Sequence, residues 1–179
     1  LEGESIALTF TATDNAGNSM TDNSLTLKLD KTLPAGYSIT IDQEYINLSN
    51  QNAMSFTFSD AEIGTIYNYT IDDENDNTST VTESGSVTVT DETIDIDVSS
   101  LSDDELTLSV SLSDKAGNKG PEATDSVEKD TVEPTLTAVS ISSDNDNSKQ
   151  AKVGDTVTLD ITSSEEIAEP SVTIAGQDA

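Results

Sequence analysis

The chain has 179 residues, with 35 Asp and Glu against 7 Lys and Arg, so its formal charge is -28. This balance argues against nucleic acid and anionic membranes as partners, because both attract clustered Lys and Arg, whereas a cation such as calcium would relieve the repulsion. The sequence contains neither Cys nor His, which excludes disulfides and thiolate metal sites and removes the commonest general base and zinc ligand.

The first predicted element is a pair of strands within residues 1–33. The phrase LTFTATDNAGN, from Leu8 to Asn18, alternates apolar and polar residues and then enters a turn that contains glycine. Alternation at period two predicts a strand with one buried face. We expect residues 1–33 to be the last two strands of a preceding domain.

Residues 34–133 contain enough alternating segments for one complete domain. Short turn sequences such as SNQN, DDENDN and DKAGNKGPE separate these segments, and no stretch has a helical apolar stripe. The chain is therefore predicted to be all-β. The strands expected in this domain are residues 37–41, 53–58, 65–71, 86–90, 94–98, 105–113 and 123–128.

Seven short strands in about 100 residues predict an immunoglobulin-like β-sandwich. The chain lacks Cys and Trp, so the core must consist of Ile, Leu, Val, Phe and Tyr. We expect Phe56, Ile66, Leu108 and Val110 to be buried. The paired aromatic residues of SFTFS and YNYTI are expected to pack in the same core.

Residues 134–179 are predicted to be the beginning of a following immunoglobulin-like domain. Strands are expected at residues 136–142, 156–161 and 171–175, where apolar and polar residues again alternate. The chain is thus interpreted as one whole domain, residues 34–133, between two incomplete domains of a tandem array.

An internal repeat supports this organisation. The segment LTFTATDNAGN has a similar counterpart 100 residues later, LSVSLSDKAGN, from Leu108 to Asn118. The carboxylate of Asp114 is expected to accept hydrogen bonds from the backbone just ahead of it. Gly17 and Gly117 are expected to adopt positive φ at the tips of the two hairpins.

The residues LSVSLSDKAGNKGPEATDSVEKDTVEPTLTAVSISSDN and AKVGDTVTLDITSSEEIAEPSVTIAGQ resemble bacterial immunoglobulin-like repeats. Such repeats occur in large surface proteins and RTX-type adhesins of Gram-negative bacteria. The Asp-x-Ala-Gly-Asn hairpin and the KDTVEP junction match the seam between domains in that family. The resemblance implies an extracellular location, on the bacterial cell surface, and a role mostly as a spacer.

The densest group of potential metal ligands is DDENDN, residues 72–77. Oxygen ligands at alternate positions suit calcium, so Asp73, Asn75 and Asp76 form a candidate calcium site. The letters from Asp73 to Asn77 match the calcium motif of cadherin linkers, although that motif joins two domains. The alternative interpretation is a solvated acidic turn.

A second candidate calcium site lies at the junction between domains. SDNDN, residues 143–147, follows the seam between Asp130 and Pro134. An ion that joins two domains would need carboxylates from both sides, for example Asp130 with Asp144 or Asp146. An ordinary polar turn is the alternative here.

These observations favour a non-enzymatic spacer within a bacterial adhesin or extracellular fibre, whose partners are neighbouring immunoglobulin-like domains. A second hypothesis is a filament subunit whose incomplete domains are completed by other chains through strand complementation. A third is an accessory domain of a secreted polysaccharide-degrading enzyme. The sequence does not identify a receptor.

Overall fold

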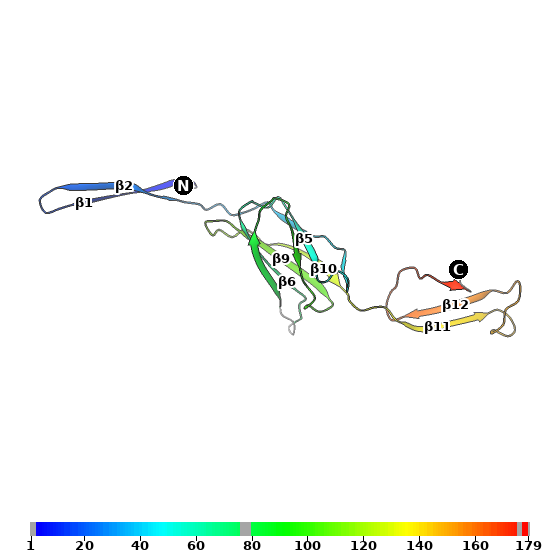
Figure 1. The fold of residues 1–179 in the computed structure, drawn as a ribbon. Coiled ribbons are helices and arrows are strands. Elements are labelled where there is room, and N and C mark those ends of the chain that lie inside the picture. The colour runs from blue at the N-terminus through cyan, green and yellow to red at the C-terminus, as the bar shows by residue number, and fades with distance from the viewer. Residues whose placement is uncertain (1–2, 76–79, 175–176, 179) are drawn as a thin grey trace. The chain divides into compact units, whose positions relative to one another are not determined.

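A computed structural model describes residues 3–75, 80–174 and 177–178, and it is built from strands alone within those residues. The predicted all-β class is therefore confirmed. The chain divides into two compact units, Leu1–Thr131 and Val132–Ala179, which are described separately below (Figure 1).

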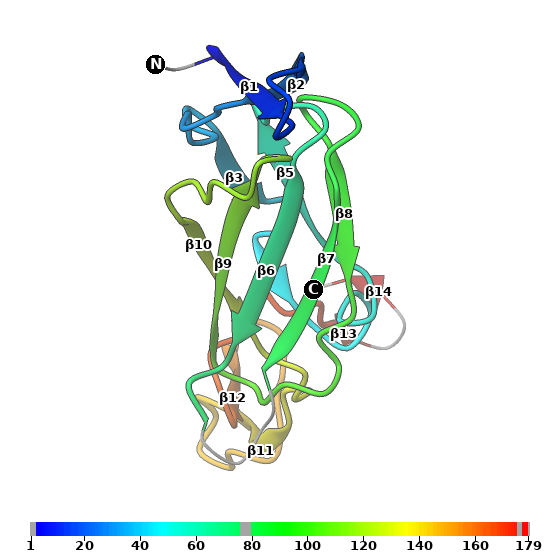
Figure 2. The ribbon, with the colours of Figure 1, turned by 90° about the vertical axis from the view of Figure 1, so that its left-hand side faces the viewer.

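The first unit contains a two-sheet domain. The larger sheet has the strand order β4-β10-β9-β6-β7, and the smaller sheet has the order β3-β5-β8. Figure 2 shows β10, β9, β6 and β7 side by side. All neighbouring strands are antiparallel except β4 and β10, which are parallel. The strands are β3 (Ser38–Ile41), β4 (Tyr45–Ile46), β5 (Met54–Ser59), β6 (Ile66–Asp72), β7 (Val81–Ser86), β8 (Thr93–Ile96), β9 (Glu105–Ser113) and β10 (Ala123–Lys129).

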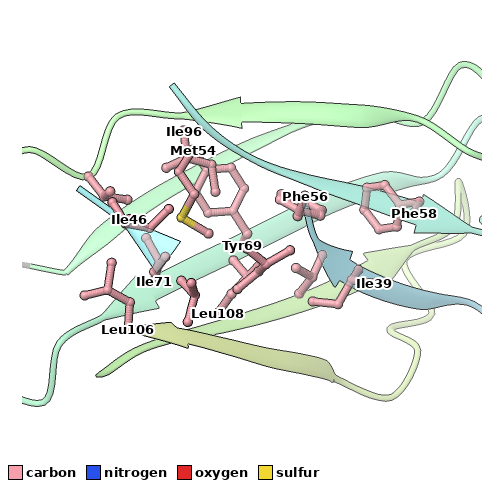
Figure 3. Packing of buried hydrophobic residues seen from close by; sticks show 14 of the residues in the cluster. Ile39, Ile46, Met54, Phe56, Phe58, Tyr69, Ile71, Ile96, Leu106 and Leu108 are labelled. Carbon is pink, nitrogen blue, oxygen red and sulfur yellow. The ribbon is translucent and has the colours of Figure 1, made fainter. Parts of the chain in front are cut away.

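The inward faces of both sheets form one apolar core (Figure 3). Phe56 and Phe58 of β5 are fully buried, and their rings meet edge to face with centroids 5.2 Å apart. Phe56 also contacts the ring of Tyr69 from the opposite sheet, at 6.0 Å. Leu108 and Val110 are fully buried as well. The prediction that the aromatic pairs pack in the core is confirmed.

The prediction for Ile66 is wrong, because this residue is 42% exposed. Successive side chains of a strand point to opposite faces. In β6 it is Tyr69 and Ile71 that point into the core, and Tyr67 packs against its edge. Ile66 therefore faces outward, and its apolar character alone gave no information about which face it occupies.

One predicted strand is displaced in the structure. We expected residues 86–90 to form a strand, but β7 covers Val81–Ser86 instead and pairs with β6. The segment VTESGS is mostly polar and lies at a sheet edge, so it lacks the alternation that signals a buried face. Gly85 is required there because a Cβ would collide with the ring of Tyr67.

The short strand β4 was not predicted, whereas β9 has the predicted bounds, and the other strands of the two-sheet domain match within about two residues. Two residues are too few to show any alternation. The pairing of β4 with β10 joins segments more than 80 residues apart in the sequence, Tyr45 with Glu128 and Ile46 with Lys129.

The remaining strands form hairpins. In the first unit, β1 (Ser5–Thr13) pairs with β2 (Ser19–Lys28), as expected for residues 1–33. In the second unit, β11 (Leu136–Ser143) pairs with β12 (Val157–Ser163), and β13 (Thr173–Ile174) pairs with β14 (Gln177–Asp178). The division of the chain into domains 1–33, 34–133 and 134–179 stays a prediction.

Candidate functional site

The repeated phrase forms the same turn in both hairpins. In the β9–β10 connection, Oδ1 of Asp114 accepts hydrogen bonds from the N–H groups of Ala116 and Asn118, both at 2.8 Å. Its Oδ2 accepts a third from the side-chain amide of Asn118, also at 2.8 Å. Gly117 closes the turn by donating its N–H to the carbonyl of Asp114. A single carboxylate thus accepts the hydrogen bonds of two backbone N–H groups in the turn.

The turn between β1 and β2 repeats this geometry atom for atom. Asp14 accepts from the N–H of Ala16 at 2.9 Å, and from the N–H and the side chain of Asn18 at 2.8 Å each. Gly17 has a φ of 90°, and Gly117 has a φ of 89°. Both values lie in the left-handed region that favours glycine, so the predicted positive φ is confirmed at both tips.

The hydrogen bonds of this turn stabilise the ionised form of its aspartate. The side chain of Asn118, assisted by the N–H groups of Asn118 and Ala116, holds the pKa of Asp114 below its ordinary value of 3.8. The corresponding bonds from Asn18 lower the pKa of Asp14 in the same way. These carboxylates therefore act as fixed anionic caps at neutral pH.

The equivalence extends from the turns along both hairpins. Leu8 pairs with Leu25 in β1–β2, and Leu108 pairs with Asp125 in β9–β10. At the turn end, Thr13 pairs with Ser19, and Ser113 forms a bridge with Lys119. Each pair recurs at an offset of 100 residues. The β1–β2 hairpin therefore has the register of the β9–β10 hairpin at these positions, although Phe10 pairs with Asp22 whereas Val110 pairs with Ala123.

The second unit reproduces a different part of the two-sheet domain. Ile39 pairs with Phe58 and Ile41 with Phe56 across β3 and β5. Across β11 and β12, Val139 pairs with Ile161, and Ile141 pairs with Leu159. The first strand is offset by 100 residues and the second by 103, so the connection between the strands is three residues longer. The β11–β12 hairpin thus corresponds to β3–β5.

The equivalent faces differ in their burial. Leu108 and Val110 are inaccessible in the core, but their counterparts Leu8 and Phe10 are 57% and 59% exposed. Likewise Ile41 is buried, and its counterpart Ile141 is 66% exposed. Both terminal hairpins therefore carry apolar faces that nothing within their own units covers.

The first candidate calcium site is partly described. Asp73 is 2% exposed, and its two carboxylate oxygens accept hydrogen bonds from the N–H groups of Asn75 and Ser102. Asn75 also donates from its side chain to the hydroxyl of Ser102, at 3.0 Å. Asp76 lies outside the described residues. Asp73 therefore ties the β6–β7 loop to the loop that precedes β9.

The candidate residues of the junction site lie in two units. Asp130 follows β10, and its N–H donates to the carbonyl of Ile46 at 2.8 Å. In the other unit, Oδ1 of Asp144 accepts from the N–H of Thr156 at 3.0 Å, and Asp146 is exposed in the same loop. Asp144 thus closes the β11–β12 connection.

Within the described residues, no three Asp or Glu side chains gather closely enough to hold a metal ion. The oxygen types present suit calcium, but the carboxylate of Asp73 already accepts backbone hydrogen bonds that an ion would have to replace. Calcium binding at Asp73, Asn75 and Asp76, or at Asp130, Asp144 and Asp146, stays a prediction.

One important side chain gave no signal in the sequence. Lys129 is only 3% exposed, and its ammonium donates to the carbonyls of Val98 at 3.0 Å and Leu101 at 2.5 Å. It thereby fixes the loop before β9 to the end of β10. Lys129 precedes Asp130 at the seam, and the sequence analysis made no prediction for it.

Comparison with solved structures finds five matching chains, among them the following one. A crystal structure of a tetra-tandem repeat in the extending region of a large adhesion protein aligns with 91% of this chain and 46% of its own length, at 20% identity and a TM-score of 0.43. The chain therefore spans about half of that structure. No protein-family model matches the chain, and no curated protein matches it.

No helical segment of membrane-spanning length and hydrophobicity occurs in the part of the chain that the structure describes.

Proposed function

We propose that the chain is a non-enzymatic structural module of a bacterial cell-surface adhesion protein, made of tandem immunoglobulin-like sandwiches. The repeated register supports this proposal. β1–β2 corresponds to β9–β10, and β11–β12 corresponds to β3–β5, so the chain holds parts of three copies of one domain. Repetition of a folded unit along one chain projects a distal part away from the cell surface.

A non-enzymatic role is favoured by the chemistry of the acidic residues. The chain contains no His or Cys. The carboxylates of Asp14 and Asp114, at the turns, have lowered pKa values, whereas a general acid requires a raised one. The hydrogen bonds that these two carboxylates accept from the turn backbone indicate that they stabilise the turns.

The observation that carries the mechanical role is the contact between the two ends of the central domain. β4 near its beginning is parallel to β10 at its end, and the N–H of Asp130 extends this contact by bonding the carbonyl of Ile46. The carboxylate of Asp125 also accepts a hydrogen bond from the N–H of Ile41 in β3, at 2.8 Å.

Tension along a tandem array pulls the two ends of each domain in opposite directions. Because β4 and β10 run parallel, this tension makes the strands slide past each other and strains their hydrogen bonds together rather than one after another. An antiparallel pair of terminal strands would instead open from one end. The arrangement resists extension, as a spacer under load requires.

Single-molecule stretching of the chain between its two ends tests this role. The central domain of about 100 residues should unfold in one step and lengthen by about 300 Å or more, given roughly 3.3–3.6 Å per extended residue. Asp130→Pro removes the N–H that bonds Ile46 and should lower the unfolding force.

Asp130→Ala is the matched control, because it removes the same side chain and keeps the N–H. Its unfolding force should remain close to that of the wild type. Equal forces for the proline and alanine variants, or extension of the wild type without a discrete step, would contradict the mechanical role.

A further inference from the structure

We propose that Asn47 is an acceptor for an N-linked sugar, and that the ring of Tyr45 supports the first sugar unit. Neither statement depends on the mechanical role of the central domain. The tripeptide Asn47-Leu48-Ser49 has the Asn-x-Ser pattern of N-glycosylation acceptors. So short a pattern also occurs by chance, and the conformation of the loop that holds it is therefore decisive.

The tripeptide lies between β4 and β5, in a turn that backbone hydrogen bonds hold together. The carbonyl of Asn47 accepts hydrogen bonds from the N–H groups of Asn50 and Gln51, at 3.2 and 3.0 Å. The carbonyl of Gln51 in turn accepts the N–H of Val98 at 2.9 Å, which ties the loop to the segment after β8. Asn47, Leu48 and Ser49 are all exposed. An ordered turn thus presents the tripeptide at the surface.

The side chain of Asn47 is bonded through its oxygen. Oδ1 accepts two hydrogen bonds from Ser49, one from the backbone N–H at 2.9 Å and one from the hydroxyl at 2.6 Å. Within the described residues, no hydrogen bond uses Nδ2 of this side chain. The hydroxyl that the pattern requires therefore contacts the carboxamide, whose nitrogen stays available.

This contact favours attack by the nitrogen. A carboxamide nitrogen is a poor nucleophile because its lone pair is delocalised onto the oxygen. Hydrogen bonds to Oδ1 stabilise the negative charge that develops on that oxygen when Nδ2 loses a proton. The deprotonated amide is the stronger nucleophile, so the turn prepares Asn47 for sugar transfer.

The sugar donor is a glycosyl diphosphate, linked to a nucleotide or to a lipid. Nδ2 forms a bond to the anomeric carbon of the sugar as the bond from that carbon to the diphosphate oxygen breaks. The diphosphate leaves with the electron pair, and one proton of Nδ2 passes to a base of the transferase. The step involves no oxidation or reduction.

Tyr45 precedes Asn47 by two residues and supplies an apolar platform. Ile46, between them, is buried in the core (Figure 3). Side chains alternate along a strand, so Tyr45 and Asn47 both lie on the outward side. Tyr45 is 57% exposed, and the neighbouring Leu48 is 59% exposed. The negative face of an aromatic ring attracts the C–H groups of a sugar ring, which carry partial positive charge.

A second tripeptide of the same pattern, Asn68-Tyr69-Thr70, is a natural control. It lies within β6, whose backbone pairs with β9 on one side and with β7 on the other. Asn68 and Thr70 are exposed, but within the described residues no hydrogen bond joins their side chains. Asn68 therefore lacks the turn that brings the hydroxyl to the carboxamide, and it should carry no sugar. A third tripeptide, residues 77–79, lies outside the described residues.

Mass spectrometry of the protein isolated from the cells that naturally produce it tests the proposal. Cleavage after glutamate is needed, because no Lys or Arg lies between the two tripeptides. It places Asn47 in residues 45–62 and Asn68 in residues 63–74. The first fragment should carry added sugar and the second should not. A single hexose would indicate a nucleotide-linked donor, and a preassembled oligosaccharide would indicate a lipid-linked donor.

Substitutions at Ser49 separate the hydroxyl from the backbone of the turn. Ser49→Ala removes the hydroxyl and keeps the N–H that bonds Oδ1, and the sugar on Asn47 should be lost. Ser49→Thr supplies a hydroxyl again, and the sugar should be present. Thr70→Ala is the matched control, because it changes the equivalent residue of the other tripeptide and should leave Asn47 modified.

Melting temperatures test the platform. The wild type with the sugar should melt at a higher temperature than the wild type produced without the transferase. Tyr45→Phe keeps the ring and should retain this difference, whereas Tyr45→Ala should lose it. An equal difference in the phenylalanine and alanine variants would overturn the role of the ring.

Three outcomes would overturn the acceptor assignment: an unmodified Asn47 in the wild type, a sugar that persists in Ser49→Ala, or equal modification of Asn47 and Asn68. Each of these results is independent of the comparison between the proline and alanine variants at Asp130. This proposal and the mechanical role therefore fail separately.

Discussion

Removing the side chain of Leu108 tests the core and the repeat together. Leu108→Ala deletes three carbons from a fully buried position, and at about 0.8 kcal/mol per carbon the lost transfer free energy is about 2.4 kcal/mol. The cavity left between the two sheets adds to this loss. The free energy of unfolding should therefore fall by about 3–5 kcal/mol.

The natural control is the residue that occupies the same register 100 positions earlier. Leu8 has the same chemistry and the same place in its hairpin, but it is 57% exposed. Leu8→Ala should leave the stability of the central domain unchanged within about 0.5 kcal/mol. The comparison separates burial from local strand preference, because the two substitutions are identical.

Urea unfolding followed by tyrosine fluorescence provides the measurement. The chain has four Tyr and no Trp, and all four Tyr lie between Tyr37 and Tyr69, so the signal reports the central domain. The Leu108→Ala midpoint should decrease strongly, with little change in the slope. Equal midpoints for the two variants would refute the assignment of Leu108 to a packed core.

Three further predictions concern the turns and the acidic loops. Gly117→Ala should destabilise the central domain by about 1 kcal/mol in the same urea assay, because its φ of 89° strains any residue with a Cβ; an unchanged midpoint would contradict this. The pKa of Asp114 is lower in the folded state than in the unfolded state, so the stabilisation by its carboxylate is present above about pH 4 and is lost as the pH falls through the folded-state pKa. Thermal melts should show a penalty for Asp114→Ala at about pH 7 that becomes smaller in acid, and a penalty that does not change with pH would contradict this. If Asp73, Asp76, Asp144 or Asp146 ligates calcium, millimolar calcium should raise the melting temperature more than magnesium does at equal ionic strength. Melting curves in calcium that are identical to those in chelator would contradict calcium binding.

The sequence by itself determined the features that depend on local chemistry. The alternation in LSVSLS predicted the bounds of β9, and its apolar residues proved to be fully buried, although Ser111 is buried as well. The Asp-x-Ala-Gly-Asn phrase predicted both turns, because a short carboxylate side chain and a glycine with positive φ are sufficient to close them. These are interactions between residues a few positions apart.

Only the tertiary structure determined which side chains are buried, because burial depends on residues that are distant in the sequence. Ile66 and Tyr67 are adjacent and both hydrophobic in part, and alternation shows that they face opposite ways without showing which one meets the core. Lys129 became buried because the carbonyls of Val98 and Leu101 converge on its ammonium. Leu108 and Leu8 occupy equivalent positions in their hairpins, but Leu108 is buried and Leu8 is exposed. Burial depends on whether a second layer packs against the strand, which the sequence of the strand does not specify.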